Sequence, residues 1–194
     1  MSLSLSVRRR LLTGLFAGSL LLFGGTAVAA VPAAAPTADD SVTVAWTDGP
    51  CTGTTGVTVV VDFTGHAGGD VVRRCTDGDP ATAFAALTDV DVAPEHGIGQ
   101  GETGPYQYLC RIDGLPSATA DACDGFLPNA PYWAFWVPDV AGDAWGYADE
   151  GVDTYDPPLG DVLGFSFGAG TVADPNEMSL TLDEALDPNW TPTS

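Results

Sequence analysis

The feature that most constrains the fold is an aromatic segment at residues 132–147, which reads YWAFWVPDVAGDAWGY. Side chains alternate between the two faces of a β-strand, so Trp133 and Phe135 would share one face while Tyr132 and Trp136 share the other. Both faces of this strand are therefore apolar. The strand either lies inside a small β-rich core or presents one aromatic face for binding, and both interpretations stay open.

A shorter aromatic pattern follows the turn, and the two together predict a hairpin. Trp145 and Tyr147 share a face across Gly146. The missing side chain of this glycine leaves room for another ring of the protein or for a ligand.

The N-terminal segment has the pattern of a secretory signal peptide. Three arginines at 8–10 precede an apolar run at 11–23, and Ala-Val-Ala at 27–29 forms a cleavage motif. We predict cleavage after Ala29 and an extracellular mature protein, with the general secretory route favoured over the twin-arginine route. The apolar run is too short for a permanent anchor, so no stable membrane insertion is expected after cleavage.

Removal of this signal peptide, residues 1–29, would leave a strongly acidic chain. The full chain has 6 basic and 26 acidic residues. Three of the basic residues lie in the signal peptide, so the mature formal charge is −23. Such a surface repels phosphate backbones and anionic lipid headgroups, which excludes nucleic acid as a partner. Solubility, salt tolerance and attraction of cations would use the same charges, and the count does not separate them.

Four cysteines fit an exported protein with two disulfides. Of the three pairings, we favour Cys51 with Cys75 and Cys110 with Cys123, because each closes a local strand-turn-strand segment. On the chain-entropy estimate, loops of these lengths contribute about 3 kcal/mol each. A four-thiolate zinc site is rejected because no Cys-x-x-Cys pair is present.

Alternating apolar residues predict the strands. The strongest is GVTVVVDF, interpreted as a central strand, with Val57, Val59, Val61 and Phe63 on one face and Thr58, Val60 and Asp62 on the other. The stretch PEHGIGQGETGP is interpreted as a long loop, since glycine dominates it. The predicted strands span 41–46, 56–63, 70–75, 90–92, 106–116 and 132–136, with a last strand around Phe165 and Phe167.

One convincing helix is predicted between these strands. Asp79 is placed as the N-cap, Pro80 as the first helical residue, and residues 81–87 as the body. The acidic tail at 171–194 contains an alternating run of Met178, Leu180 and Leu182, which predicts one edge strand paired with residues 42–46. The predicted organisation is an Ala/Pro linker at 30–40 and a single domain at 41–170. Its class is α+β, a mixed or antiparallel sheet crossed by one short helix.

The segments that match catalytic or metal-binding motifs lack the neighbouring residues and elements that such chemistry requires. The GFSFG motif around Ser166 lacks a following helix and a downstream histidine, so Ser166 is interpreted as a strand residue. The acidic clusters, one at 77–79 and one at 149–156, do not reproduce an EF-hand, so calcium is not expected. No catalytic residue and no metal ligand is assigned, and the chain is predicted not to be an enzyme.

Several segments in order resemble the small secreted actinobacterial proteins whose domain is related to the C-terminal β-domain of transcobalamin and intrinsic factor. The resemblance covers about residues 51–170 and implies a β-grasp-like sheet crossed by one helix, without catalysis. The segments that carry it are GVTVVVDF at 56–63, VVRRC at 71–75, GDPATAFAAL at 78–87, YLCRIDGLP at 108–116, YWAFW at 132–136, WGY at 145–147 and GFSFG at 164–168.

In transcobalamin-type proteins cobalamin lies between this domain and an α-helical barrel domain, which this chain lacks, so the resemblance implies half of a corrinoid site. By position, it places Tyr132, Trp136, Trp145 and Tyr147 toward a ligand or partner. The leading hypothesis is a secreted, non-catalytic binding module for a small ligand, with cobalamin-like corrinoids as candidates, or for an extracellular protein. The alternative is a structural or adhesion module of the cell envelope in which the aromatic residues are core.

Overall fold

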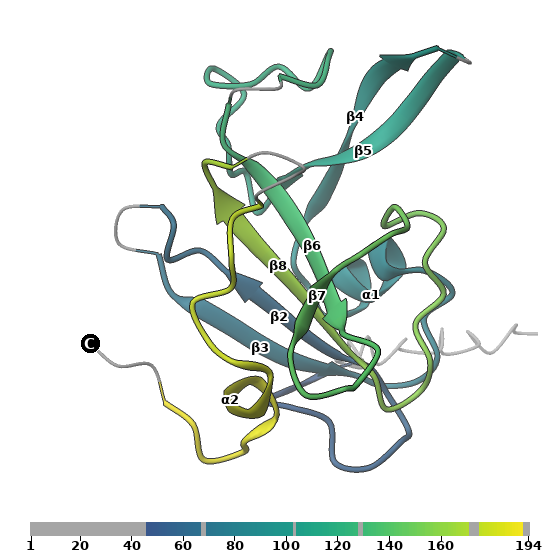
Figure 1. Cartoon of the computed structure of the whole chain (residues 1–194), viewed down its shortest axis with the longest axis vertical. Coiled ribbons are helices and arrows are strands. Elements are labelled where there is room, and N and C mark those ends of the chain that lie inside the picture. The colour runs from purple at the N-terminus through teal and green to yellow at the C-terminus, as the bar shows by residue number, and fades with distance from the viewer. Residues whose placement is uncertain (1–45, 67–68, 103, 128–129, 171–174, 192–194) are drawn as a thin grey trace, which may run out of the picture. The chain divides into compact units, whose positions relative to one another are not determined.

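The chain folds around a six-stranded sheet in which one adjacent pair of strands is parallel and the other pairs are antiparallel. The computed structural model describes residues 46–66, 69–102, 104–127, 130–170 and 175–191. The strand order is β1-β3-β2-β8-β6-β7, and β2 with β8 is the parallel pair (Figure 1). A separate hairpin, β4 with β5, extends beyond one end of the sheet. The strands are β1 (Trp46–Asp48), β2 (Thr58–Asp62), β3 (Val71–Thr76), β4 (Pro94–Gly101), β5 (Gly104–Ile112), β6 (Tyr132–Pro138), β7 (Trp145–Tyr147) and β8 (Val162–Gly168).

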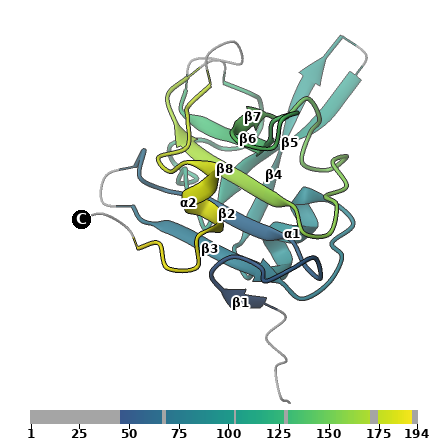
Figure 2. The same ribbon diagram turned by 60° about the horizontal axis from the view of Figure 1, so that its bottom comes forward.

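Both faces of the sheet are covered. Helix α1 (Ala83–Asp89) lies against one face, and helix α2 (Leu182–Leu186) with the rest of the C-terminal segment, residues 175–191, lies against the other (Figure 1). Figure 2 shows α2 near β2 and β8. The predicted mixed α+β class is confirmed, but the prediction of one helix is wrong, since the described residues contain two.

Strand β2 is the central strand that its sequence predicts. All five of its residues are buried. Val59 and Val61 pack in the cluster under α1, whereas Val60 packs in the cluster under α2. Burial of one such side chain stabilises a fold by about 1.5–3 kcal/mol, so a strand with valines on both faces suits this place between two layers.

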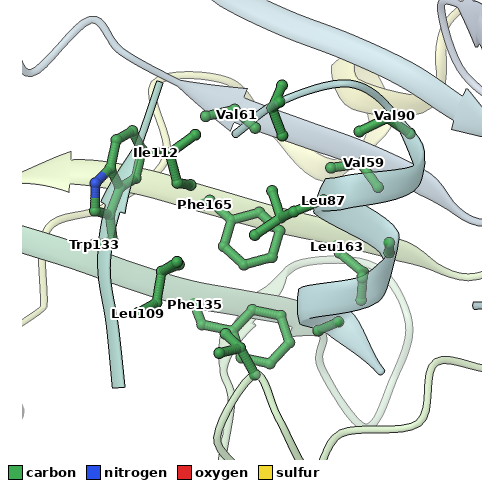
Figure 3. Packing of buried hydrophobic residues seen from close by; sticks show 14 of the residues in the cluster. Val59, Val61, Leu87, Val90, Leu109, Ile112, Trp133, Phe135, Leu163 and Phe165 are labelled. Carbon is green, nitrogen blue, oxygen red and sulfur yellow. The ribbon is translucent and has the colours of Figure 1, made fainter. Parts of the chain in front are cut away.

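The larger core lies between the sheet and α1. Leu87 of α1 contacts the sheet near Phe165 of β8, which stacks on Phe135 of β6 at 5.1 Å between ring centroids (Figure 3). Leu87 and Phe165 are completely buried. Trp133 closes one end of this cluster, beside Ile112.

Helix α1 begins later than its sequence suggests. Its N-cap is Thr82, whose hydroxyl accepts a bond from the Ala85 amide at 3.1 Å, so the predicted Asp79 cap and Pro80 start are wrong. The next two amides, those of Ala83 and Phe84, donate to the Tyr155 and Val152 carbonyls at 2.9 Å each. A contact with a distant loop therefore sets where this helix begins, and a local capping pattern does not include that contact.

The predicted edge strand in the tail is also wrong. Thr181 and Glu184 form a capping box that starts α2 at Leu182, and the bonds from Thr181 lower the pKa of the Glu184 carboxyl. Leu180 and Leu182 are buried against the sheet face and not at its edge. Residues 42–45 of the proposed partner strand lie outside the described residues, and Trp46 pairs with Thr76 of β3.

Arg73 and Arg74 are neighbours on β3, and each caps the end of a different helix. Arg73 donates to the carbonyls of Glu184, Ala185 and Asp187 at the end of α2. On the other face, Arg74 donates to the Val90 carbonyl at the end of α1 at 2.6 Å. Cations at helix C-termini are favourable because the last carbonyls lack partners within the helix.

Both predicted disulfides are confirmed. Cys51 bonds to Cys75 with a Cα–Cα distance of 4.8 Å, and Cys110 bonds to Cys123 with a Cα–Cα distance of 5.8 Å. Disulfides of this kind persist in oxidising compartments. Within the described part of the chain, no helix is both long and apolar enough to cross a membrane. The predicted signal peptide and linker lie outside the described residues.

Candidate functional site

The two aromatic faces of β6 have different surroundings. Trp133 and Phe135 point toward α1 and are 5% and 7% exposed, so they belong to the larger core. Tyr132 and Trp136 lie on the opposite face, together with Trp145 and Tyr147 of β7, because Trp136 is directly paired with Tyr147. The four residues that the sequence singles out therefore share one face of the hairpin.

The structure divides these four residues into two pairs. The tryptophans lie under the C-terminal segment: the Trp136 indole N–H donates to Ser166 Oγ at 2.8 Å, and the Trp145 indole N–H donates to the Leu180 carbonyl at 2.9 Å. Trp136 is only 7% exposed and Trp145 is partly buried. Trp145 therefore bonds directly to the C-terminal segment, whereas Trp136 bonds to Ser166 of β8, whose hydroxyl donates to the Asn176 carbonyl of that segment.

The tyrosines instead face a groove at the edge of the sheet. Tyr147 is 36% exposed, and burial raises the pKa of its phenol, while a hydrogen bond with Tyr132 opposes this shift. The Tyr147 ring also meets Trp136 edge-on at 5.5 Å between centroids. Because β7 pairs with β6 only from Trp136 onward, the groove runs beside the part of β6 that has no strand on this side among the described residues.

Five aromatic side chains form a continuous row along this groove, which we call the aromatic row: Tyr106 and Tyr108 from β5, Phe126 from the connection after it, Tyr132 and Tyr147. Successive centroids are 6.3 Å apart from Tyr106 to Tyr108, 5.7 Å from Tyr108 to Phe126 and 6.1 Å from Phe126 to Tyr132. The aromatic groove has a volume of about 360 Å³. It is lined by Tyr106, Gln107, Tyr108, Leu109, Phe126, Tyr132, Trp133, Phe135, Tyr147, Ala148, Glu150, Gly151 and Val152.

Glycines of β4 orient the two tyrosines of β5. A Cβ atom on Gly97 would lie 2.3 Å from Cζ of Tyr108, and one on Gly99 would lie 2.3 Å from Cζ of Tyr106. Each ring therefore lies flat over a glycine of the neighbouring strand. The residues predicted to form a glycine-rich loop form β4, and the alternation of glycines at every second position opposite alternating tyrosines is the signal that could have revealed both the hairpin and this half of the groove.

The groove offers aromatic faces together with the hydroxyl groups of its tyrosines. Burial raises the pKa of the Tyr108 phenol, as do the nearby Asp121 and Asp124 carboxylates and Tyr106, although its bond to the Gly125 carbonyl at 3.0 Å opposes this. Glu150 carries the one carboxylate among the described lining residues. Such a site favours stacking with some hydrogen bonding.

The side chains that could carry other chemistry have structural partners. Ser166 is 1% exposed and donates to the Asn176 carbonyl at 2.5 Å. His96 pairs with Asp153 at 2.6 Å and stacks on Phe84 at 3.8 Å between centroids. Arg111 bonds to Glu95 and to two backbone carbonyls. In the described part of the chain, the one cluster compact enough for a metal is Cys110, Asp121 and Cys123, and its thiols are joined in a disulfide.

Comparison of the chain with models of protein families, with curated proteins and with solved structures gave no match. The resemblance to the transcobalamin-type β-domain therefore stays a prediction.

Proposed function

We propose that the chain is a secreted, non-catalytic binding module that takes a small planar ligand into the aromatic groove. The observation that carries this proposal is the aromatic row, in which five rings from four separate segments follow one another at the surface. Core packing does not require Tyr106, which is 44% exposed, or Tyr147, which is 36% exposed. Exposed rings arranged in a row are costly for a monomer unless they meet a ligand or partner.

The size of the groove limits the ligand. About 360 Å³ is at the lower end of the range of roughly 300–1,000 Å³ for small-molecule sites. A corrinoid is much larger, so this groove would hold only one part of it, which agrees with the half-site that the transcobalamin resemblance implies. We also propose that the sheet crossed by α1 is β-grasp-like, and the parallel pair β2 and β8 beneath α1 supports this assignment.

A titration of the predicted mature chain, residues 30–194, tests the proposal. Tyrosine and tryptophan fluorescence would be followed with corrinoids and with riboflavin, a smaller planar probe. We expect binding of at least one probe, weakened about three- to tenfold in Tyr106→Ala and in Tyr147→Ala, since each removes one stacking surface. Val140→Ala is the matched control, because Val140 is fully exposed and lies outside the groove. Absence of binding by every probe, or equal binding by all variants, would overturn the proposal.

A structural or adhesion module of the cell envelope is the second candidate. The observation that favours it is the burial of Trp136 and Trp145, which makes half of the predicted aromatic surface part of the core. This candidate predicts that no aromatic variant changes a binding property without also unfolding the domain. Thermal unfolding of Tyr106→Ala and Tyr147→Ala, measured beside their titrations, separates the two candidates.

A further inference from the structure

A second and larger cavity lies at another end of the sheet, where the parallel strands β2 and β8 finish. Its volume is about 690 Å³, within the usual range for small-molecule sites. Its walls come from the turn after β2, from the connection between β5 and β6, and from Phe167 near the end of β8. We call it the end cavity, and it shares no lining residue with the aromatic groove.

The apolar walls of the end cavity are fixed by the core. Phe63 and Phe167 both line it, and both pack on Trp133, at 5.3 Å and 5.2 Å between ring centroids. The Trp133 indole N–H donates to the carbonyl of Leu115, another wall residue, at 2.8 Å. A Cβ on Gly65 would lie 1.9 Å from the Phe167 carbonyl oxygen, so the turn after β2 packs directly against β8. These described parts of the wall are therefore held in place by contacts with the core.

The ionisable groups around the end cavity are almost all acidic. Asp70, Asp113 and Asp121 line it together with His66, and none of its described lining residues is a lysine or arginine. The three carboxylates have no ion-pair partner among the described residues. Arg111 lies behind the wall, where it donates to the Pro116 and Asp121 carbonyls, but its charge is paired with Glu95.

We infer that the end cavity is a second binding site, for an organic cation with an apolar body, such as a protonated arylalkylamine. The carboxylates would attract the ammonium group while the phenylalanine rings contact the apolar body, and ring faces also attract cations. An anion of the same shape would be repelled by the three carboxylates. The net charge of the whole chain, −20, would also attract cations to the protein and so add to the effect of the three carboxylates.

Three probes of similar shape and different charge test this site. Binding of phenethylamine, 2-phenylethanol and 3-phenylpropionate to the predicted mature chain would be measured by calorimetry at low and moderate salt. We expect phenethylamine to bind about tenfold more tightly than 2-phenylethanol, with 3-phenylpropionate the weakest and with added salt reducing the differences. Equal binding of the amine and the alcohol, or binding of neither, would overturn the assignment.

Two triple variants with the same change in net charge locate the effect. Asp70→Asn/Asp113→Asn/Asp121→Asn should lose the preference for the amine, whereas the control Asp77→Asn/Asp149→Asn/Asp156→Asn, built from exposed acids outside the cavity, should keep it. Asparagine can still accept the backbone bonds that Asp113 and Asp121 receive. It also tolerates the φ of 48° at Asp113. An equal loss in both triple variants would show that the overall charge, and not this cavity, attracts the amine.

Tyr106→Ala separates the end cavity from the aromatic groove. We expect it to leave phenethylamine binding unchanged, because Tyr106 lines only the groove. Loss of amine binding in this variant would assign the amine to the groove and overturn the inference of a second site.

Discussion

Two pairs of aromatic residues on one face of the β6–β7 hairpin differ in what covers them. Trp136 and Trp145 lie beneath the C-terminal segment, and each indole N–H has an acceptor. Tyr132 and Tyr147 lie farther along the same face, beside a groove. The difference shows that strand alternation assigns a side chain to a face, whereas the path of a distant segment decides whether that face is core or surface.

The largest expected effect comes from the covered pair. Trp136→Ala removes a ring that is 7% exposed and leaves Ser166 without the indole donor, so we expect a loss of about 3–5 kcal/mol in the free energy of unfolding. Urea denaturation followed by circular dichroism measures it. A loss below about 1 kcal/mol, the size expected for a surface residue, would remove the distinction between the pairs.

Leu182→Ala tests the C-terminal segment as the cover. Leu182 is 3% exposed and packs against the sheet with Val60 and Val162, so the expected loss is about 2–4 kcal/mol. Tryptophan emission should also shift to longer wavelength, because a loosened segment exposes Trp145. Leu186→Ala is the matched control, since Leu186 is 42% exposed on the same helix. An equal cost for the two leucines would contradict the proposed role of Leu182.

Tyr147→Ala should have a much smaller effect on stability. The side chain is 36% exposed, so the expected loss is below about 1 kcal/mol, measured by the same denaturation. A loss as large as that of Trp136→Ala would place Tyr147 in the core and support the structural-module alternative.

The smallest and most specific effect is expected in the alkaline pH dependence of stability, which depends on Tyr155 on the other side of the sheet. Burial, followed by the nearby Asp161 carboxylate, raises the pKa of Tyr155 to about 12. The phenol of the unfolded chain ionises near pH 10, so the unfolded state loses its proton first and stability should fall as pH rises from about 10 through 12. Tyr155→Phe should reduce this fall in stability, as measured by urea denaturation at several pH values. An unchanged pH dependence would exclude Tyr155 as its source.

Local patterns predicted much of the fold. The three consecutive valines at 59–61 put apolar side chains on both faces of β2, so its place between two layers followed from the pattern. The spacing of the cysteines within local strand-turn-strand segments gave both disulfides. These features depend on residues close in sequence, where periodicity and loop length carry the information.

The remaining features depend on contacts between distant segments. Tyr106 and Tyr108 joined the candidate site only because the β4–β5 hairpin brings them to Phe126 and Tyr132. Trp145 does not belong to the candidate site, because its indole N–H donates to the Leu180 carbonyl, 35 residues away in sequence. The alternating run of Met178, Leu180 and Leu182 did not show whether the tail forms a strand or a helix. Leu180 and Leu182 can reach the sheet from either conformation. Only the capping box of Thr181 and Glu184 signalled the helix.

The capping role of the arginines has a consequence for proteolysis. The chain contains no lysine, and its six basic residues are the three arginines near the N-terminus together with Arg73, Arg74 and Arg111. Trypsin cleaves after lysine and arginine, so the described residues offer it three bonds, each next to a side chain that is held by backbone carbonyls. Cleavage at these positions requires the sheet or the hairpin to open first. The rate of digestion by trypsin would therefore report how readily the domain opens.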